Sequence, residues 1–158
     1  MARFLTDGEV ALCRPIFGDG VAYELVSLQD GPGANPVARI AFGRGNPAIT
    51  LGRRIYFRAP PSPDFSTAGD AAKGLFIHEM THVWQYQRLT FVGFLLRYAD
   101  EFFAHGRVAA KLYDFAPGET RFADATLEAQ AEIVSHYALG PDRALALNMA
   151  GSGLYGGL

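Results

Sequence analysis

Apolar residues recur with helical spacing in some parts of the chain and form short β-prone runs in others. The helical spacing predicts helices at about residues 7–17, 71–89, 91–105 and 127–139, with one further turn within 141–149. The β-prone runs predict short strands at about residues 21–28, 37–42, 48–51, 54–58 and 110–115. Residues 29–36 are expected to form a loop, and the glycine-rich tail at about 150–158 is expected to be flexible or loosely packed.

Local signals support several of these elements. Polar residues that can cap a helix N-terminus precede three helices, and they are Thr6 with Glu9 in a capping box, Ser66 or Thr67, and Asp124 or Thr126. The run at 54–58 is the clearest strand because turn residues flank it on both sides. If this strand has an open edge, that edge can accept an extended peptide through backbone hydrogen bonds, and an ordinary edge strand is the alternative.

Composition and charge limit the class of protein. A chain of 158 residues with 49% hydrophobic and 19% charged residues suits one globular domain over 1–158. Net charge is −2 and the basic residues are scattered, so no nucleic-acid or membrane partner is expected. The single cysteine, Cys13, excludes an intrachain disulfide. No signal-peptide core or membrane-length apolar run is visible, so we expect a cytoplasmic protein unless a dedicated secretion system exports it.

The segment at 75–85 contains the pattern H-E-x-x-H, formed by His78, Glu79 and His82. Residues four apart lie on one face of a helix, so both imidazoles can bind one Zn²⁺. Glu79 is offset around the helix, where it can act as the catalytic general base on water without being a ligand. Two histidines that only pack or form hydrogen bonds are the alternative. Trp84 and Gln85 are expected to pack and cap this helix.

A catalytic zinc site needs a third protein ligand and keeps a fourth position open. The last predicted helix offers Glu128, Glu132 and His136 at i, i+4 and i+8 beside an apolar stripe. A second helix that supplies a glutamate to an H-E-x-x-H helix is a gluzincin arrangement. We favour Glu128 as the ligand and expect Glu132 to orient one histidine through its far ring nitrogen, with the reverse assignment left open. A solvated glutamate is the alternative for either residue.

These residues resemble the bacterial Vgr-related proteins, a family of small gluzincin-like metallopeptidases. The similarity extends from Leu5 to about Tyr137 and is most specific at residues 78–85, which read H-E-M-T-H-V-W-Q. The last helix of that family reads approximately E-Q-Q-A-E-I-V-x-D-Y, and this match implies that Glu128 is the zinc glutamate. His136 stands where the family has an aspartate, and a histidine there could compete for the metal. The family name refers to a type VI secretion spike protein, which implies a possible link to a bacterial secretion system.

The sequence therefore predicts a zincin-like (gluzincin) α+β domain. A small, mainly antiparallel sheet would pack on the H-E-x-x-H helix, and a second helix would supply the third ligand. We expect a zinc metallopeptidase that hydrolyses a peptide or protein substrate, with Tyr113, His136 or Tyr137 stabilising the oxyanion. The alternative function is a non-catalytic zinc-binding adaptor or secretion accessory, whose fourth ligand would be a side chain such as His136 or His105.

Overall fold

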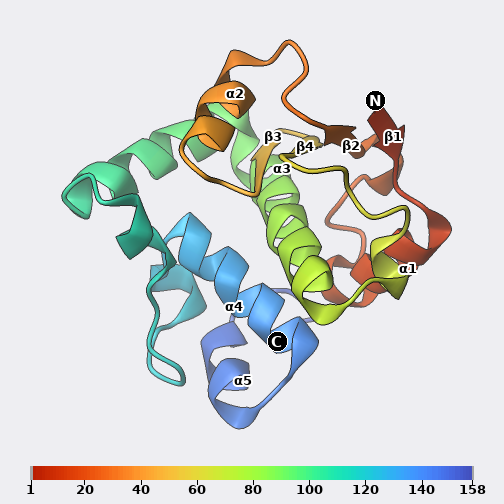
Figure 1. Ribbon diagram of the computed structural model, residues 1–158. Helices are drawn as coiled ribbons and strands as arrows, with labels where there is room; N and C mark the ends of the chain where they lie inside the picture. The colour runs from red at the N-terminus through yellow and green to blue at the C-terminus, as the bar shows by residue number, and fades with distance from the viewer. Residues whose placement is uncertain (1, 158) are drawn as a thin grey trace.

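A computed structural model describes residues 2–157 of the chain (Figure 1). The helices are α1 (Asp7–Phe17), α2 (Pro36–Gly43), α3 (Asp70–Ala104), α4 (Leu127–Leu139) and α5 (Arg143–Met149). The strands are β1 (Ala2–Phe4), β2 (Ser27–Asp30), β3 (Ala48–Leu51) and β4 (Arg54–Phe57). Short 3₁₀ segments lie at Tyr23–Leu25, Phe65–Thr67, Ala109–Tyr113 and Phe122–Asp124. Among the described residues, none of the helices combines the length and apolar character that crossing a membrane requires.

The four strands form one small mixed sheet in the order β1-β2-β4-β3. β1 pairs with β2 and β3 with β4 in antiparallel fashion, whereas β2 and β4 are parallel. The chain passes through α2 and β3 before β4 returns alongside β2. β4 therefore lies inside the sheet, and the prediction of an open edge on the strand at 54–58 is wrong. Within the part of the chain that is described, β3 ends the sheet on that side.

α3 runs through the centre of the molecule beside the sheet (Figure 1). It joins the two helices predicted at 71–89 and 91–105 across a kink at Thr90, where φ is 64° and ψ is 166°. Its N-cap is Gly69, and the predicted caps Ser66 and Thr67 lie in the preceding 3₁₀ segment. Residues 76–86 are all buried, whereas several large apolar side chains beyond the kink are exposed, namely Phe91, Val92, Leu95, Leu96 and Phe103. The first half of α3 is therefore the central element of the core.

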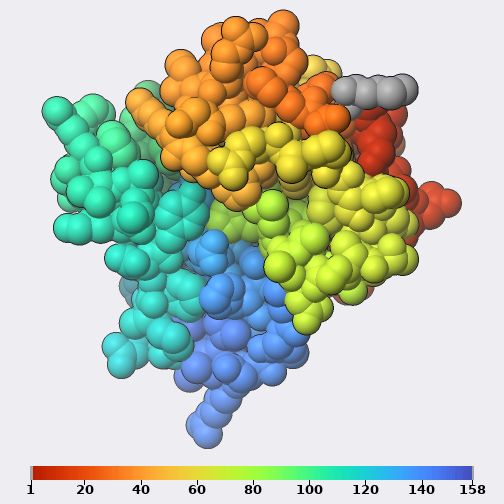
Figure 2. All heavy atoms as spheres, viewed as in Figure 1, coloured from red at the N-terminus to blue at the C-terminus, as the bar shows by residue number. Residues whose placement is uncertain are grey.

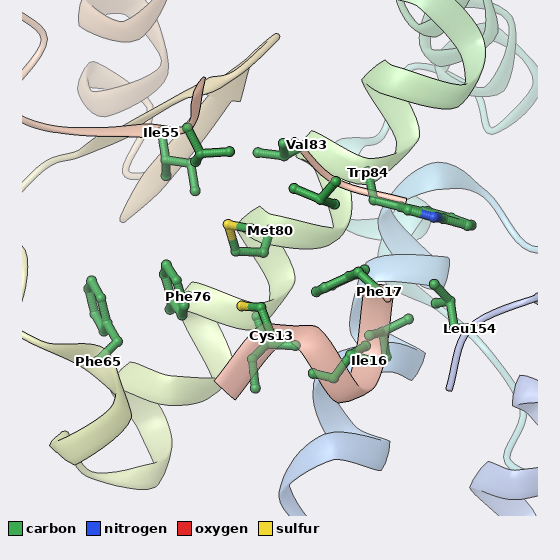
Figure 3. Close-up of a cluster of buried hydrophobic side chains, with 14 of the residues drawn as sticks. Cys13, Ile16, Phe17, Ile55, Phe65, Phe76, Met80, Val83, Trp84 and Leu154 are labelled. Carbon is green, nitrogen blue, oxygen red and sulfur yellow. The ribbon is translucent and has the colours of Figure 1, made fainter. Parts of the chain in front are cut away.

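The main hydrophobic core lies between α3, the sheet and α1 (Figure 3). Phe76 and Met80 of α3 are fully buried in one cluster with Ile55 of β4 and Cys13 of α1. Phe65 stacks on Phe76 with ring centroids 4.8 Å apart. Because side chains two residues along a helix point to roughly opposite sides, this packing turns the histidine-bearing face of α3 away from the sheet core.

Buried hydrogen bonds to Glu9 link the N-terminal elements to this core. Thr6 caps α1, and the predicted capping box with Glu9 is confirmed. The fully buried Glu9 carboxylate accepts hydrogen bonds from the Arg3 guanidinium at 2.6 and 2.8 Å and from the Phe65 backbone N–H at 3.1 Å. A buried carboxylate with this many donors joins β1, α1 and the segment that leads into α3.

Several local predictions need correction. Residues 37–42 belong to α2 rather than to a strand, because the Asn35 side chain accepts hydrogen bonds from two backbone N–H groups and Pro36 occupies the first turn. Residues 21–28 contain a 3₁₀ turn before β2, and most of the strand predicted at 110–115 is also 3₁₀. An apolar run without a repeating period does not distinguish these structures.

The helices at the C-terminal end agree more closely with the sequence. α4 has the predicted bounds and is capped by Thr126, one of its two candidates. The turn expected within 141–149 is α5. The glycine-rich tail is packed rather than loose, since Leu154 is 1% exposed and the Tyr155 N–H donates to the Ile16 carbonyl at 2.8 Å. Apolar residues between the glycines bury the tail against α1.

Candidate metal centre

α4 packs beside α3 (Figure 1), and its Glu128 meets the two histidines of α3. Two side chains of α3 form hydrogen bonds with the backbone of Leu127, the first residue of α4. The Leu127 N–H donates to Glu101 Oε2 at 2.9 Å, and the Leu127 carbonyl accepts from Gln85 Nε2 at 3.0 Å. These two contacts set the position of α4 along its own axis. The next residue, Glu128, is thereby placed opposite the H-E-x-x-H turn.

His78, His82 and Glu128 converge in a compact, buried group. The Nε2 atoms of the two histidines are 3.2 Å apart, and Glu128 Oε2 lies 3.2 Å from His78 Nε2 and 3.1 Å from His82 Nε2. Ligand atoms about 2.0–2.1 Å from a tetrahedral zinc ion are separated by about 3.3 Å. The nearly equilateral triangle therefore has the size that such an ion requires. Within residues 2–157, these three side chains form a group that could hold a metal ion.

The far ring nitrogen of each histidine also has a partner. His78 Nδ1 lies 3.1 Å from Glu132 Oε1, and His82 Nδ1 lies 2.8 Å from Gln85 Oε1. An acceptor at Nδ1 favours the tautomer that carries its proton there and leaves the Nε2 lone pair for a metal. Glu128 thus contacts the Nε2 atoms inside the triangle, and Glu132, one helical turn later, contacts the far nitrogen of His78 from outside it.

Glu79 lies beside this triangle and is not part of it. The residue is 4% exposed, and its Oε2 accepts a 2.7 Å hydrogen bond from the Thr50 hydroxyl of β3. Its side chain lines the same cavity as the two histidines. A buried carboxylate next to a ligand group but outside it is in a position where a general base can act.

The charges of the group are strongly coupled. Burial alone would lower the pKa of His78, but hydrogen bonds to Glu128 and Glu132 and the negative charge of Glu79 outweigh it and raise that pKa to about 10. Burial would likewise lower the pKa of His82, but the charge of Glu128 and the hydrogen bond to it together outweigh burial and raise that pKa. Burial would raise the pKa of Glu128, but the two histidines hold it well below its usual range. The site is thus built to keep positive charge beside a buried carboxylate, and a cation can replace the protons.

The triangle lies at a cavity of about 1040 Å³, at the upper end of the range of ligand pockets. Figure 2 shows α3 recessed between the region of α2 and β3 on one side and α4 on the other. The cavity wall includes apolar side chains that are exposed to solvent, namely Val37, Ile40, Leu95, Tyr113 and Leu139. The triangle and Glu79 therefore border one cavity whose wall reaches the surface of the molecule.

The three candidates for oxyanion stabilisation are placed differently. Tyr113 lines the cavity and stacks on His78, with ring centroids 6.0 Å apart. Burial raises the pKa of Tyr113, so its phenol remains a hydrogen-bond donor. The His136 side chain is 55% exposed, and its Nε2 lies 3.2 Å from Glu132 Oε2. Tyr137 packs on Tyr155 and, in the described residues, is not part of the cavity wall.

The two histidines considered as a fourth ligand lie outside the triangle. His105 follows α3, with its Nδ1 2.8 Å from the Glu101 carbonyl oxygen. His136 contacts Glu132 and not the inner group. Over residues 2–157, neither belongs to the group that could hold a metal.

Two features of the site were not predicted from the sequence. Thr50 contacts Glu79 from a strand 29 positions away, and nothing in the local pattern indicates this pairing. Gln85 was expected only to pack and cap the helix, whereas its side chain contacts His82. The i+3 spacing of Gln85 from His82 was the available signal, because residues three apart are neighbours on a helix surface.

Comparisons with known proteins support homology to a secretion-system effector. No family model matches the chain. The chain is 34% identical over 139 residues to the type VI secretion system spike protein VgrG2b of Pseudomonas aeruginosa, a match that covers 87% of this chain but 13% of that protein. The structure of the effector domain of P. aeruginosa VgrG2b matches with a TM-score of 0.66 and 29% identity, over 93% of this chain and 81% of that one. The chain is homologous to that effector domain.

Proposed function

We propose that this chain is a zinc-dependent hydrolase of peptide bonds, with His78, His82 and Glu128 as metal ligands and Glu79 as general base. The observation that carries the proposal is the triangle of two imidazole nitrogens and one carboxylate oxygen, with edges of 3.1–3.2 Å. Two imidazoles whose nitrogens face each other this closely repel one another when both are protonated. A single cation that all three atoms share relieves that repulsion.

The donor set favours zinc. Two neutral imidazoles and one carboxylate form a known ligand set of catalytic zinc, in which the fourth position stays open. When bound, the ion would supply Lewis-acid chemistry by lowering the pKa of a water molecule and polarising a carbonyl group. The ligands line the cavity, so the open position would be accessible to a substrate.

The remaining residues have separate roles in this proposal. Oε2 of Glu79 is held by Thr50, which leaves Oε1 to take a proton from the attacking water and return it to the leaving nitrogen. Tyr113 is the proposed donor to the developing oxyanion, since its protonated phenol borders the cavity beside His78. Glu132 would hold the His78 ring in its ligating orientation.

The edge of β3 supports a peptide as the substrate. The Arg58 N–H donates to the Pro47 carbonyl at 2.8 Å, so residues 47, 49 and 51 direct their backbone groups toward β4 in the antiparallel ladder. The backbone groups of Ala48 and Thr50 then point the other way, along the edge that borders the cavity. An extended peptide can pair with this edge and lie across the site. We therefore propose that β3, and not the strand at 54–58, is the edge that accepts an extended peptide.

The homology extends the proposal to the setting in which the enzyme works. The matching region of the relative is an effector domain of a type VI secretion spike protein. We propose that this chain is a zincin-like effector that such a system exports, and that its substrate is a peptide or protein at the destination. The helix pair that carries the triangle and the sheet edge beside it are the features that support a zincin-like fold.

Metal analysis combined with peptide cleavage tests the function. Wild-type protein should take up zinc and cleave members of a peptide library. Glu79→Gln should keep zinc and lose cleavage, whereas Glu128→Ala should bind zinc much more weakly. Zinc binding by wild type without any cleavage would favour the non-catalytic adaptor. A folded wild-type protein that takes up no zinc would reject both functions.

A further inference from the structure

A row of buried amide groups connects His82 to the segment that carries Glu128. Gln85 Oε1 lies 2.8 Å from His82 Nδ1, and Gln85 Nε2 donates to the Leu127 carbonyl and to Gln130 Oε1, both at 3.0 Å. Gln130 Nε2 in turn donates to the Phe122 carbonyl at 2.8 Å. Gln85 is 1% exposed and Gln130 is 5% exposed, so water has little access to replace these contacts.

The row has only one consistent direction of donation. The Phe122 carbonyl can only accept, so Gln130 must turn its NH₂ group toward Phe122 and its oxygen toward Gln85. Gln85 then faces two acceptors, Gln130 Oε1 and the Leu127 carbonyl, and must turn its own NH₂ group toward them. Its oxygen is left for His82, which must carry its proton on Nδ1. The Nε2 lone pair of His82 is therefore directed at the triangle.

We propose that Gln85 and Gln130 are positioning residues that fix the tautomer and the ring orientation of His82 from the backbone at the start of α4. This inference rests on the proposed metal site and adds a coupling within it. The 122–130 segment supplies Glu128 and, through the two amides, also orients a ligand on α3. A shift of α4 along α3 would therefore disturb two of the three ligands together.

The two histidines differ in how they are oriented. The partner of His78 is the carboxylate of Glu132, whose side chain is 30% exposed and also contacts His136. The partner of His82 is a neutral, fully buried amide that has no freedom to rotate without losing two further hydrogen bonds. Zinc binding should thus depend on Gln130, although Gln130 touches none of the ligands directly.

Zinc affinity measured by competition with a chromophoric chelator tests this coupling. Gln85→Met and Gln130→Met keep the approximate length of the side chain and remove its hydrogen bonds. We expect Gln85→Met to weaken zinc binding by about 10–100-fold and Gln130→Met to weaken it by a smaller factor, at least about threefold. The matched control is Gln87→Met on the same helix, where the exposed Gln87 side chain accepts a hydrogen bond from the Ala22 N–H, and it should stay within twofold of wild type.

A second readout separates positioning from a loss of fold. Long-range ¹H–¹⁵N spectra of the zinc-loaded wild type should show His82 protonated on Nδ1, and far-UV circular dichroism should show the metal-free variants folded. Unchanged zinc affinity in Gln85→Met would overturn the proposal, and unchanged affinity in Gln130→Met would overturn the relay. If Gln85→Met does not fold, the zinc affinity of Gln130→Met decides the proposal. That variant keeps the direct contact between Gln85 and His82 and removes only the hydrogen bonds that hold Gln85 from behind. A zinc-loaded wild type without peptidase activity would refute the proposed function and leave these affinity results standing.

Discussion

Replacing Thr50 by valine tests whether β3 positions the general base. Valine keeps the β-branched shape that suits a strand and removes only the hydroxyl that donates to Glu79 Oε2 at 2.7 Å. The same hydroxyl lies 3.2 Å from the Glu79 carbonyl, and its single proton serves the shorter contact. Thr50→Ser is the matched control, because it restores a donor at the same place.

The structure sets the size of the expected effect. A hydrogen bond to a charged group contributes about 1.5–3 kcal/mol. If all of that free energy holds Glu79 in its reactive orientation, its loss lowers kcat by about ten- to a hundredfold. The upper value is a limit, because water from the adjoining cavity can partly replace the hydroxyl. KM and zinc content should stay unchanged, since Thr50 contacts neither the triangle nor, through its side chain, the substrate edge.

The assay measures kcat and KM on one cleavable peptide, with zinc stoichiometry determined on the same samples. We expect Thr50→Val to lose kcat alone and Thr50→Ser to recover most of it. A kcat within twofold of wild type in Thr50→Val would refute the reasoning. A parallel loss of zinc would mean that β3 supports the ligand helix as a whole and not Glu79 in particular.

Four further predictions concern the core, the Arg3–Glu9 pair and the charges of the site. Phe76→Ala should lower the free energy of unfolding by about 3–5 kcal/mol in urea denaturation, because the side chain is fully buried and stacked on Phe65, and a loss below about 1 kcal/mol would contradict its place in the core. Glu9→Ala should cost about 1–3 kcal/mol in the same assay, because the buried Phe65 N–H loses its acceptor while the partly exposed Arg3 guanidinium keeps the Phe4 and Ser62 carbonyls, and a neutral result would contradict this role of Glu9. Metal-free protein should lose stability as pH rises from about 6.5, the ordinary pKa of histidine, through about 10, because the raised pKa of His78 stabilises the folded state only while that ring is protonated. Zinc affinity should rise over the same pH range, because the metal must displace the protons. Unfolding of chelator-treated protein and zinc titration, each at pH 6 and pH 9, test both. Higher stability or weaker zinc binding at pH 9 would contradict the reasoning.

Local signals account for the parts of the fold that could be predicted. α1 and α4 begin and end close to where the sequence places them, because the Thr6 and Thr126 caps act within a few residues. Local signals can also be overlooked, as the Asn35-Pro36 start of α2 shows, since an apolar run was taken there for a strand. The order of the strands in the sheet, by contrast, depends on contacts between distant parts of the chain. β4 is interior and β3 is at the edge because β2 and β4 pair across 27 positions, from Ser27 to Arg54, and no short window of sequence contains that information.

The sequence by itself determined that His78 and His82 share a helix face with Glu79 beside them, because the i, i+4 relationship is a property of the helix alone. It also narrowed the third member of the group to one face of α4. The sequence favoured Glu128 over Glu132 and left the reverse assignment open, and only the tertiary structure places Glu128 in the triangle and Glu132 one turn away against His78. The contacts of Leu127 with Gln85 and Glu101 set the axial position of α4, and these contacts join residues 42 and 26 positions apart in the chain. The placement of Thr50 against Glu79 and the amide row behind His82 have the same origin, since each depends on how separate elements pack against α3.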